Sequence, residues 1–476
     1  MARRRPSGRV PGAAHLRPDA RRGSAPCGVP GIGARYVVDP SRHSLRCLLR
    51  GAAADRHDDR ERNGPSGTRG LSRPGREHGR PRGNADAAVA SRHSSSPHRG
   101  PQGPERPQRA VRVKQRLLLI GCGAVAEGLY AGALRKLESR GMAEVAGLVD
   151  PNPSRTAALQ RLFRGAIAFK TPAEALEGVA PDLTIVASPP GHHAEHAVQA
   201  LGAGSHVLCE KPMTTNVEDA ERMVAAAREA GRVLAVGMVR RMFPSLALAK
   251  ELVEGGALGD DLRFVYREGS VYGWPVSTDA AFRRATAGGG VLTDVGSHVL
   301  DFLAAIFGAP TVAGYADDAQ ADGVETNCRF DLGFRRAGGT VQLSWSQPLV
   351  TGLQVVGSAG ELRLEPGVLE AVRWRRRGGS WQTLVGVASS PIDLGAPPAI
   401  GKPTTYFECM YHQLIRTLRA VRYGEPAAVT GEDGLLVVRT IEGCYRRATP
   451  LDLPWLSAAE QAQARERHWK RRRWAA

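Results

Sequence analysis

Short apolar runs separated by amphipathic stretches dominate the chain from residue 114 to residue 237. Five runs have the length of a buried strand: RLLLI (116–120), EVAGLV (144–149), TIVA (184–187), HVLC (206–209) and VLAV (233–236). Between them, stretches such as 192–204 and 216–231 carry apolar residues at helical spacing. Strands that alternate with helices indicate a parallel, doubly wound sheet. We therefore expect one α/β domain over residues 113–237.

Beyond residue 237 the pattern changes to strands that can alternate or pair. Four candidate strands are LRFVYREGSVYGW (262–274), NCRFDLGF (327–334), GTVQLSWS (339–346) and GELRLEP (360–366). Gly-rich turns between them favour a large open, mostly antiparallel sheet. Two helices follow, one over residues 406–421 and one after Thr430, which can cap it while Asp433 suits its positive end. We assign residues 238–456 to this second α/β domain.

The two ends of the chain differ from this body in composition and charge. Residues 1–112 are rich in Arg, Gly, Pro and Ser, with little apolar periodicity, so we interpret them as a disordered extension or a misassigned start, with Val111 or Val113 as an alternative initiator. Of the net charge of +18, +15 lies in residues 1–112 and +5 in 465–473, within a basic tail over 457–476. The body carries about −2. This distribution, with few aromatic residues in the extension, disfavours specific nucleic-acid binding.

Cysteine usage and hydropathy bear on the compartment. The seven cysteines form no Cys-x-x-Cys pair, which suits a reducing cytoplasm and argues against disulfide frameworks and zinc modules. We find no secretory signal and no apolar stretch near the roughly 18 residues that would cross a bilayer. We expect a cytoplasmic protein without a membrane partner.

The stretch GCGAVA (121–126) follows the first strand and opens a helix. It fits the dinucleotide fingerprint of a Rossmann domain, with Ala126 in the third place. Gly121 permits the tight turn, and Gly123 lets the backbone, including Cys122, approach a pyrophosphate. We expect these residues to bind NAD, with NADP as the alternative cofactor.

Asp150 ends the second strand, 24 residues after Ala126. A carboxylate there can accept hydrogen bonds from both hydroxyls of an adenosine ribose and would repel the 2′-phosphate of NADP. We therefore predict a preference for NAD, which the nearby Arg155 would soften.

Small, cyclic and charged residues end two further strands. Ser188 and Pro189 leave room for a flat ligand, and His193 opens the next helix. Glu210 and Lys211 end the strand HVLC, where a parallel sheet binds ligands. We assign all five side chains to the cofactor site. His192 and His196 stand at i and i+4, but the spacing of zinc modules is missing, so we expect no metal.

The stretch GGGVLTDVGSHVLD (288–301) contains the candidate acid–base residues. If it is helical, Asp294, His298 and Asp301 share one face. His298, with an unperturbed pKa near 6.5, is a candidate proton acceptor that Asp294 could orient and hold in its protonated form. A pair on a helix surface is the alternative interpretation of this spacing.

Together these segments resemble the glucose-fructose oxidoreductase, inositol dehydrogenase and MocA family. The resemblance covers residues 116–447 and rests on GCGAVA, on SPPGHHAEHAVQALGAGSHVLCEKP, on VGMVRRMFPSLALAKELVEGGALGD and on GGGVLTDVGSHVLD. It implies a Rossmann domain followed by an α/β domain that self-associates through an open sheet. It also implies NAD- or NADP-dependent oxidoreduction at a secondary hydroxyl of a sugar, inositol or related polyol.

The resemblance also assigns roles to residues of this chain. Lys211, Asp294 and His298 take the catalytic positions, the last two also contacting substrate, and Arg241 takes a substrate-binding position. The Arg-rich residues 1–112 have no counterpart in the family, and Ser188 stands where Thr is usual. A glycosidase that uses NAD transiently and a catalytically silent nucleotide-binding regulator remain alternative functions on the same scaffold.

Overall fold

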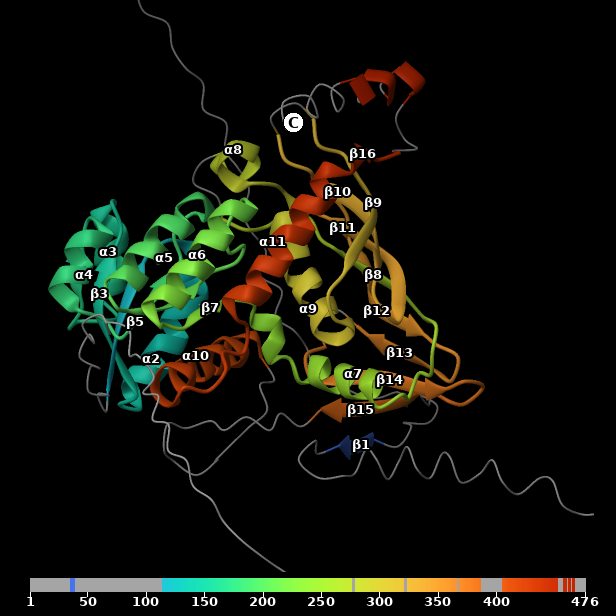
Figure 1. Cartoon of the computed structure of the whole chain (residues 1–476), viewed down its shortest axis with the longest axis horizontal. Helices are drawn as coiled ribbons and strands as arrows, with labels where there is room; N and C mark the ends of the chain where they lie inside the picture. The colour runs from blue at the N-terminus through green and yellow to red at the C-terminus, as the bar shows by residue number, and fades with distance from the viewer. Residues whose placement is uncertain are drawn as a thin grey trace, which may run out of the picture.

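The structure is a computed structural model (Figure 1). It describes residues 35–38, 114–275, 279–320, 323–365, 368–386 and 405–452, together with 457–459, 461–463 and 465–466 near the C-terminus. Apart from 35–38, the predictions for residues 1–112 lie outside the described residues, as does most of the basic tail.

The first domain is built on a parallel sheet of six strands in the order β4-β3-β2-β5-β6-β7. Its strands are β2 (Gln115–Ile120), β3 (Ala143–Val149), β4 (Ile167–Phe169), β5 (Leu183–Val186), β6 (His206–Cys209) and β7 (Leu234–Val236). The order reverses between β2 and β5, which is the switch point where doubly wound sheets bind ligands. This confirms the predicted doubly wound sheet.

Helices cover both faces of this sheet (Figure 1). They are η1 (Ala126–Tyr130), which is π-helical, α2 (Ala131–Ser139), α3 (Pro153–Gln160), α4 (Pro172–Val179), η2 (Pro190–His192), α5 (His193–Gly202) and α6 (Val217–Ala230). Asn152, Thr171 and Asn216 begin α3, α4 and α6, and each side chain accepts a hydrogen bond from a backbone N–H of the first turn.

The second domain contains a sheet of ten strands in the order β1-β15-β14-β13-β12-β8-β11-β10-β9-β16. The strands are β1 (Arg35–Val38), β8 (Leu262–Gly269), β9 (Thr311–Asp317), β10 (Asn327–Gly333), β11 (Ala337–Ser344), β12 (Leu349–Val356), β13 (Gly360–Leu364), β14 (Ala371–Arg376), β15 (Gln382–Gly386) and β16 (Ala448–Pro450). Three pairs, β1/β15, β8/β11 and β9/β16, are parallel. The other six are antiparallel, as predicted.

Helices lie on one side of this large sheet and leave the other uncovered in the view of Figure 1. The helices after β7 are η3 (Val239–Met242), α7 (Pro244–Glu254), η4 (Asp279–Phe282), α8 (Arg284–Ala287), η5 (Leu292–Gly296), α9 (Ser297–Phe307), α10 (Tyr406–Tyr423) and α11 (Gly431–Arg446). Of these, α7 contacts β14 and β15, η5 contacts β11, and α11 contacts β9. Residues 262–267 of β8 alternate between buried and exposed side chains, which fits a sheet with one core face. Thr430 caps α11, as predicted, and the Asp433 side chain accepts from the Thr430 N–H in return, which makes a capping box.

The last long helices return to the first domain. Helix α10 packs against α2, and its Met410 and Leu414 belong to the core that contains Leu117 and Leu134. Helix α11 contacts α6 on one side and α9 on the other. Helices α10 and α11 therefore pack on both domains, although the sequence boundaries place both in the second.

One helical segment of the described residues, Arg284–Phe307, is long and apolar enough to cross a membrane by length and composition alone. This finding differs from the expectation that no apolar stretch of the chain approaches that length. In the structure, 72% of its most apolar stretch of 18 residues is buried inside the fold, as in a core helix. The segment runs through η5 and α9, so it also positions Asp294 and His298.

Candidate active site

The predicted glycine turn lies at the switch point of the parallel sheet. Gly121 follows β2 with a φ of +91°, and a Cβ at this position would lie 2.5 Å from the backbone oxygen of Ala187. Only glycine can make that close approach between the ends of β2 and β5. A Cβ at Gly123 would meet no backbone atom within 4 Å, and its nearest neighbour would be Arg155 Nη1 at 3.8 Å. Ala126, the first residue of η1, is fully buried. These residues have the geometry that a pyrophosphate-binding turn requires.

Asp150 lies directly after β3, as predicted, and its carboxylate accepts two hydrogen bonds from the backbone. Oδ2 accepts a 3.0 Å hydrogen bond from the Cys122 N–H, and Oδ1 accepts a 2.9 Å bond from the Asn152 N–H. Arg155 Nη1 lies 3.9 Å from Oδ2, and only 5% of the Asp150 side chain is exposed. Asp150 therefore joins the glycine turn to the start of α3.

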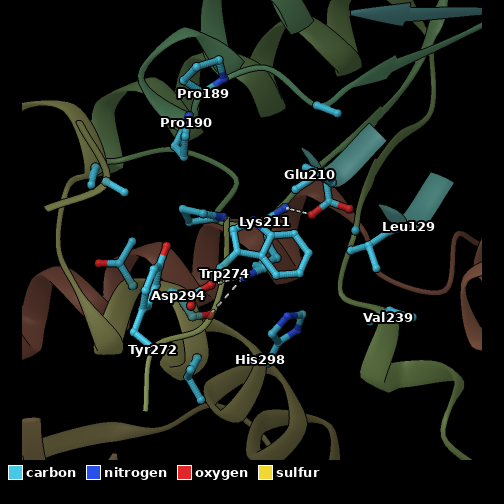
Figure 2. Close-up of a pocket in the computed structure, with 18 of the residues that line it drawn as sticks. Leu129, Pro189, Pro190, Glu210, Lys211, Val239, Tyr272, Trp274, Asp294 and His298 are labelled. Atoms are coloured by element: carbon cyan, nitrogen blue, oxygen red, sulfur yellow. Dashed lines mark hydrogen bonds and ion pairs between the residues drawn. The ribbon is translucent and has the colours of Figure 1, made fainter. Parts of the chain in front are cut away.

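A cavity of about 640 Å³ opens between the carboxyl ends of the parallel strands and the second domain (Figure 2). The predicted site residues that line it are Ser188, Pro189, His193, Glu210, Lys211, Asp294 and His298. Val125 and Leu129, from the helical segment after the glycine turn, line the same cavity. The structure thus brings together predicted site residues, from Ser188 to His298, that lie up to 110 positions apart in the sequence.

Lys211 and Asp294 meet across this cavity. The Lys211 ammonium donates to the Asp294 carboxylate and, at 3.3 Å, to the Asp294 backbone oxygen. The backbone N–H of Lys211 donates to Glu210 Oε2 at 2.9 Å, and Tyr130 donates to Glu210 Oε1 at 2.7 Å. Burial raises the pKa of Glu210. The two hydrogen bonds fix the strand end that presents the ammonium, and the Lys211–Pro212 peptide is cis.

His298 lies beside Lys211 but is not oriented by Asp294. Its side chain is buried, and Nδ1 has no hydrogen-bond partner. Burial, together with the positive charges of Lys211 and Arg240, holds the pKa of His298 well below its ordinary value of 6.5. The prediction that Asp294 holds the ring in its protonated form is therefore wrong, because the Asp294 carboxylate binds Lys211 instead. A neutral imidazole can accept a proton without first losing one.

Asp301 and Arg241 lie away from the cavity. Arg241 donates two 2.8 Å hydrogen bonds to Asp301, and its Nη2 lies 3.5 Å from Asp433 Oδ1. Asp301 is 1% exposed, so the three residues of the predicted helix face separate: Asp294 and His298 line the cavity, whereas Asp301 faces Arg241. The Arg241 guanidinium joins η3 to α9 and to the first turn of α11, and the predicted substrate contact stays a prediction.

The histidines after β5 support the cavity wall. The buried His193 lies with Nδ1 3.0 Å from the Pro212 oxygen and Nε2 2.7 Å from the Ser188 oxygen, and burial lowers its pKa to about 4. Ser188 Oγ lies 2.9 Å from His196 Nδ1. Among the described residues no group of three or more His, Cys, Asp or Glu side chains could hold a metal ion.

The segment that carries Asp294 and His298 is held by a buried carboxylate that the sequence did not indicate. Glu325 Oε1 accepts hydrogen bonds from the Gly290 N–H at 2.9 Å, the Leu292 N–H at 3.1 Å and the Tyr445 hydroxyl at 2.8 Å. Burial, together with Asp317, raises the pKa of Glu325 to about 7. A Cβ on Gly289 would lie 1.8 Å from the Tyr445 oxygen, so the glycines are needed for this packing.

Aromatic side chains complete the cavity and were missed by the sequence analysis. Tyr272 packs edge-on against Trp345 at 4.8 Å between ring centroids and, together with Trp274 and Tyr406, lines the cavity. Figure 2 shows Tyr272 and Trp274 beside Lys211 and Asp294. Two aromatic residues within three positions, at the end of the strand predicted over 262–274, were the available signal.

Two family models match the chain. Residues 115–238 match the oxidoreductase family described as having an NAD-binding Rossmann fold. Residues 246–363 match the GFO/IDH/MocA C-terminal domain.

Two relatives of known activity illustrate the similarity. The chain is 33% identical over 217 residues to D-glucoside 3-dehydrogenase of Escherichia coli (strain K12), a match that covers 45% of this chain and 60% of that protein. It is 28% identical over 313 residues to the NADP(+)-dependent scyllo-inositol 2-dehydrogenase of Bacillus subtilis (strain 168), covering 61% of this chain and 83% of that protein. The chain thus spans less than two thirds of the E. coli relative.

Solved structures share the fold. Levoglucosan dehydrogenase in complex with NADH and levoglucosan superimposes with a TM-score of 0.61 at 21% identity, covering 73% of this chain and 98% of that chain. Aldose-aldose oxidoreductase from Caulobacter crescentus, complexed with glycerol, gives a TM-score of 0.58 at 25% identity, covering 70% of this chain and 97% of that chain.

Proposed function

The chain belongs to the GFO/IDH/MocA oxidoreductase family, and on that premise we propose that it is an NAD(P)-dependent dehydrogenase acting on a secondary hydroxyl of a sugar, inositol or related polyol. One observation carries the proposal: Lys211, Asp294 and His298 line one cavity at the ligand-binding edge of a doubly wound sheet. The names of the relatives support the substrate class, since they act on glucosides and inositols.

The glycine turn, which leads into the cavity-lining residues Val125 and Leu129, suits a dinucleotide. No backbone atom crowds Gly123, since only the end of the Arg155 side chain would lie within 4 Å of a Cβ there, and η1 begins three residues later. Ser188, Pro189 and Glu210 would then flank the nicotinamide end. The nicotinamide, when bound, supplies the hydride acceptor, and the remaining chemistry falls to side chains of this chain.

His298 would act as the general base. A substrate hydroxyl must lose its proton as its carbon is oxidised, and the neutral ring can take that proton at physiological pH. Because Nδ1 is buried, Nε2 is the atom that would accept it. The Lys211 ammonium would stabilise the negative charge that develops on the substrate oxygen. Asp294 holds that ammonium in place and, at 45% exposed, has carboxylate surface left for a neighbouring hydroxyl.

A dehydrogenase screen over polyols, aldoses and their glycosides, read as NADH or NADPH formation at 340 nm, tests this function. We expect at least one cyclic polyol or sugar to give steady turnover, which Lys211→Ala should lower about 10²- to 10³-fold. Glycoside cleavage without net formation of reduced cofactor would favour the glycosidase. Nucleotide binding without turnover of any compound would favour the silent regulator.

The proposal includes self-association through the ten-stranded sheet, in the cytoplasm. The exposed face of this sheet carries Val265 on β8 and Val356 on β12, with 37% and 49% of their surfaces exposed. The two strands are neighbours in the sheet, so the apolar side chains lie on adjoining strands. Analytical ultracentrifugation should find a dimer or larger species, and Val356→Glu should shift it toward the monomer. The five described cysteines are buried and unpaired, which suits a reducing compartment.

A further inference from the structure

We propose that Arg155 and Lys170 form a binding site for the 2′-phosphate of NADP, so that the chain binds NADP(H) about as well as NAD(H). The inference rests on the proposed function, because it concerns the adenosine end of the same cofactor. The evidence for it is the burial of the Asp150 carboxylate and the presence of the cations Arg155 and Lys170 around it.

Asp150 has little capacity left to select NAD. Each carboxylate oxygen already accepts a backbone N–H, from Cys122 and from Asn152, and the side chain is 5% exposed. A ribose diol could reach only the small part of the carboxylate that stays exposed. The repulsion of a phosphate is also reduced, because the carboxylate charge is partly balanced by the Arg155 guanidinium at 3.9 Å.

Arg155 is placed to meet an anion over the glycine turn. Its side chain is 44% exposed, and Nη1 lies 3.8 Å from where a Cβ on Gly123 would stand. The guanidinium therefore lies between the turn that faces the pyrophosphate and the strand end that faces the adenosine ribose. The ion pair with Asp150 is long, which leaves donor positions for a phosphate. Arginine binds phosphate through two parallel hydrogen bonds, a geometry that ammonium groups cannot match.

A second cation comes from the neighbouring strand. Strand β4 pairs with β3 in parallel, and the Asp150 N–H donates to the Phe169 oxygen at 3.3 Å. Lys170, the next residue, is exposed at the same edge of the sheet. The first turn of α3 has no acidic residue, and its backbone N–H groups add positive potential there. This edge combines two exposed cations with a carboxylate that is buried and hydrogen-bonded.

The experiment measures direct binding of NADH and NADPH to the full chain by fluorescence titration, without substrate. We expect the two dissociation constants to agree within about tenfold for the wild type. Arg155→Ala should weaken NADPH about 10- to 100-fold, the worth of hydrogen bonds to a charged group, and leave NADH within about threefold. Lys170→Ala should weaken NADPH by a smaller factor, as expected for a more exposed charge.

Matched controls separate a loss of phosphate binding at Arg155 from a general loss of surface charge or of the structure of the glycine turn. Arg161→Ala removes an exposed arginine at the other end of α3 and should change neither affinity. Arg155→Gln keeps most of the side-chain volume, and its NADH affinity reports whether the turn stays intact. The probe 2′,5′-ADP should compete with NADPH more strongly than 5′-AMP in the wild type but not in Arg155→Ala.

Two results would overturn the inference without contradicting the proposed dehydrogenase function. One is an NADPH affinity in the wild type more than about 100-fold below the NADH affinity. The other is a ratio of NADPH to NADH affinity that Arg155→Ala does not change. If neither reduced nucleotide bound the wild type, the proposed function would itself be wrong, and this inference with it.

Discussion

The Lys211 ammonium contacts both the carboxylate and the backbone oxygen of Asp294, and so joins the two domains inside the cavity. Lys211 lies two residues after the end of β6 in the first domain. Asp294 lies in the π-helical turn η5 of the second domain. Only 19% of the lysine side chain is exposed, against 45% of the aspartate. The contact gives Lys211 a fixed position beside His298 before any ligand binds.

Replacing this lysine should impair turnover far more than cofactor binding. We expect Lys211→Ala to lower kcat about 10²- to 10³-fold, because the charge that stabilises a developing alkoxide is lost. The NADH dissociation constant should change little. Steady-state rates at 340 nm and fluorescence titration provide the two measurements. Lys250→Ala, an exposed lysine of α7, is the matched control and should keep both values. A kcat near that of the wild type in Lys211→Ala would contradict the assignment.

The pair of Arg241 and Asp301 should contribute to stability rather than to substrate affinity. Arg241→Ala leaves the Asp301 carboxylate, 1% exposed, without its bidentate partner, and we expect a loss of about 3–5 kcal/mol in the free energy of unfolding. Urea unfolding measures this loss. Arg439→Ala, which breaks an exposed pair with Glu221, should cost less than about 1 kcal/mol. Unchanged stability with a raised KM would instead support the substrate contact predicted from the sequence.

Residues before Val113 should be dispensable for folding and catalysis. The body of the chain contains a complete doubly wound sheet from β2 onward, whereas β1 adds one short strand beside β15 at the edge of the other sheet. We expect a chain that begins at Val113 to be soluble, to bind NADH with unchanged affinity and to keep kcat. Aggregation of the shortened chain, or loss of NADH binding, would show that the segment is structural.

The sheet and the glycine turn were predictable because their signals are local. Apolar runs of strand length, Gly121 and Gly123 between a strand and a helix, and caps such as Thr430 are all set by neighbours within a few residues. Parallel strand ends meet at one edge, so Lys211 could be placed at the ligand side from its position alone.

The partners of the charged residues could not be predicted, because they depend on contacts between distant segments. Asp294 was expected to face His298 from the preceding turn, yet Lys211 arrives from another domain and binds the carboxylate. The π-helical turn η5 also changes the spacing of side chains before α9, a feature that apolar periodicity does not reveal. Glu325 holds the glycine segment from 35 residues away, and nothing near it in the sequence signals this.

The pH dependence of oxidation tests the environment of His298. Burial and the charges of Lys211 and Arg240 lower its pKa well below 6.5, so the ring is neutral at pH 7 and available as a base. The oxidation rate should therefore be flat near neutrality and fall only as the pH drops through this lowered pKa, not near 6.5 as an unperturbed histidine would give.

Removing the charge of Lys211 should shift the fall in rate at low pH, the acidic limb of the profile, toward higher pH. Lys211→Met eliminates one of the two cations that disfavour the imidazolium, so the pKa of His298 should rise and the fall in residual rate should begin at a higher pH than in the wild type. His298→Ala should lose the limb altogether and lower kcat about 10²- to 10⁴-fold. Arg161→Ala, far from the cavity, should keep the wild-type profile. Profiles of kcat against pH for the four proteins, on the substrate found by the screen, provide the measurement. The same limb in His298→Ala as in the wild type would exclude His298 as the base and leave Lys211 as the next candidate.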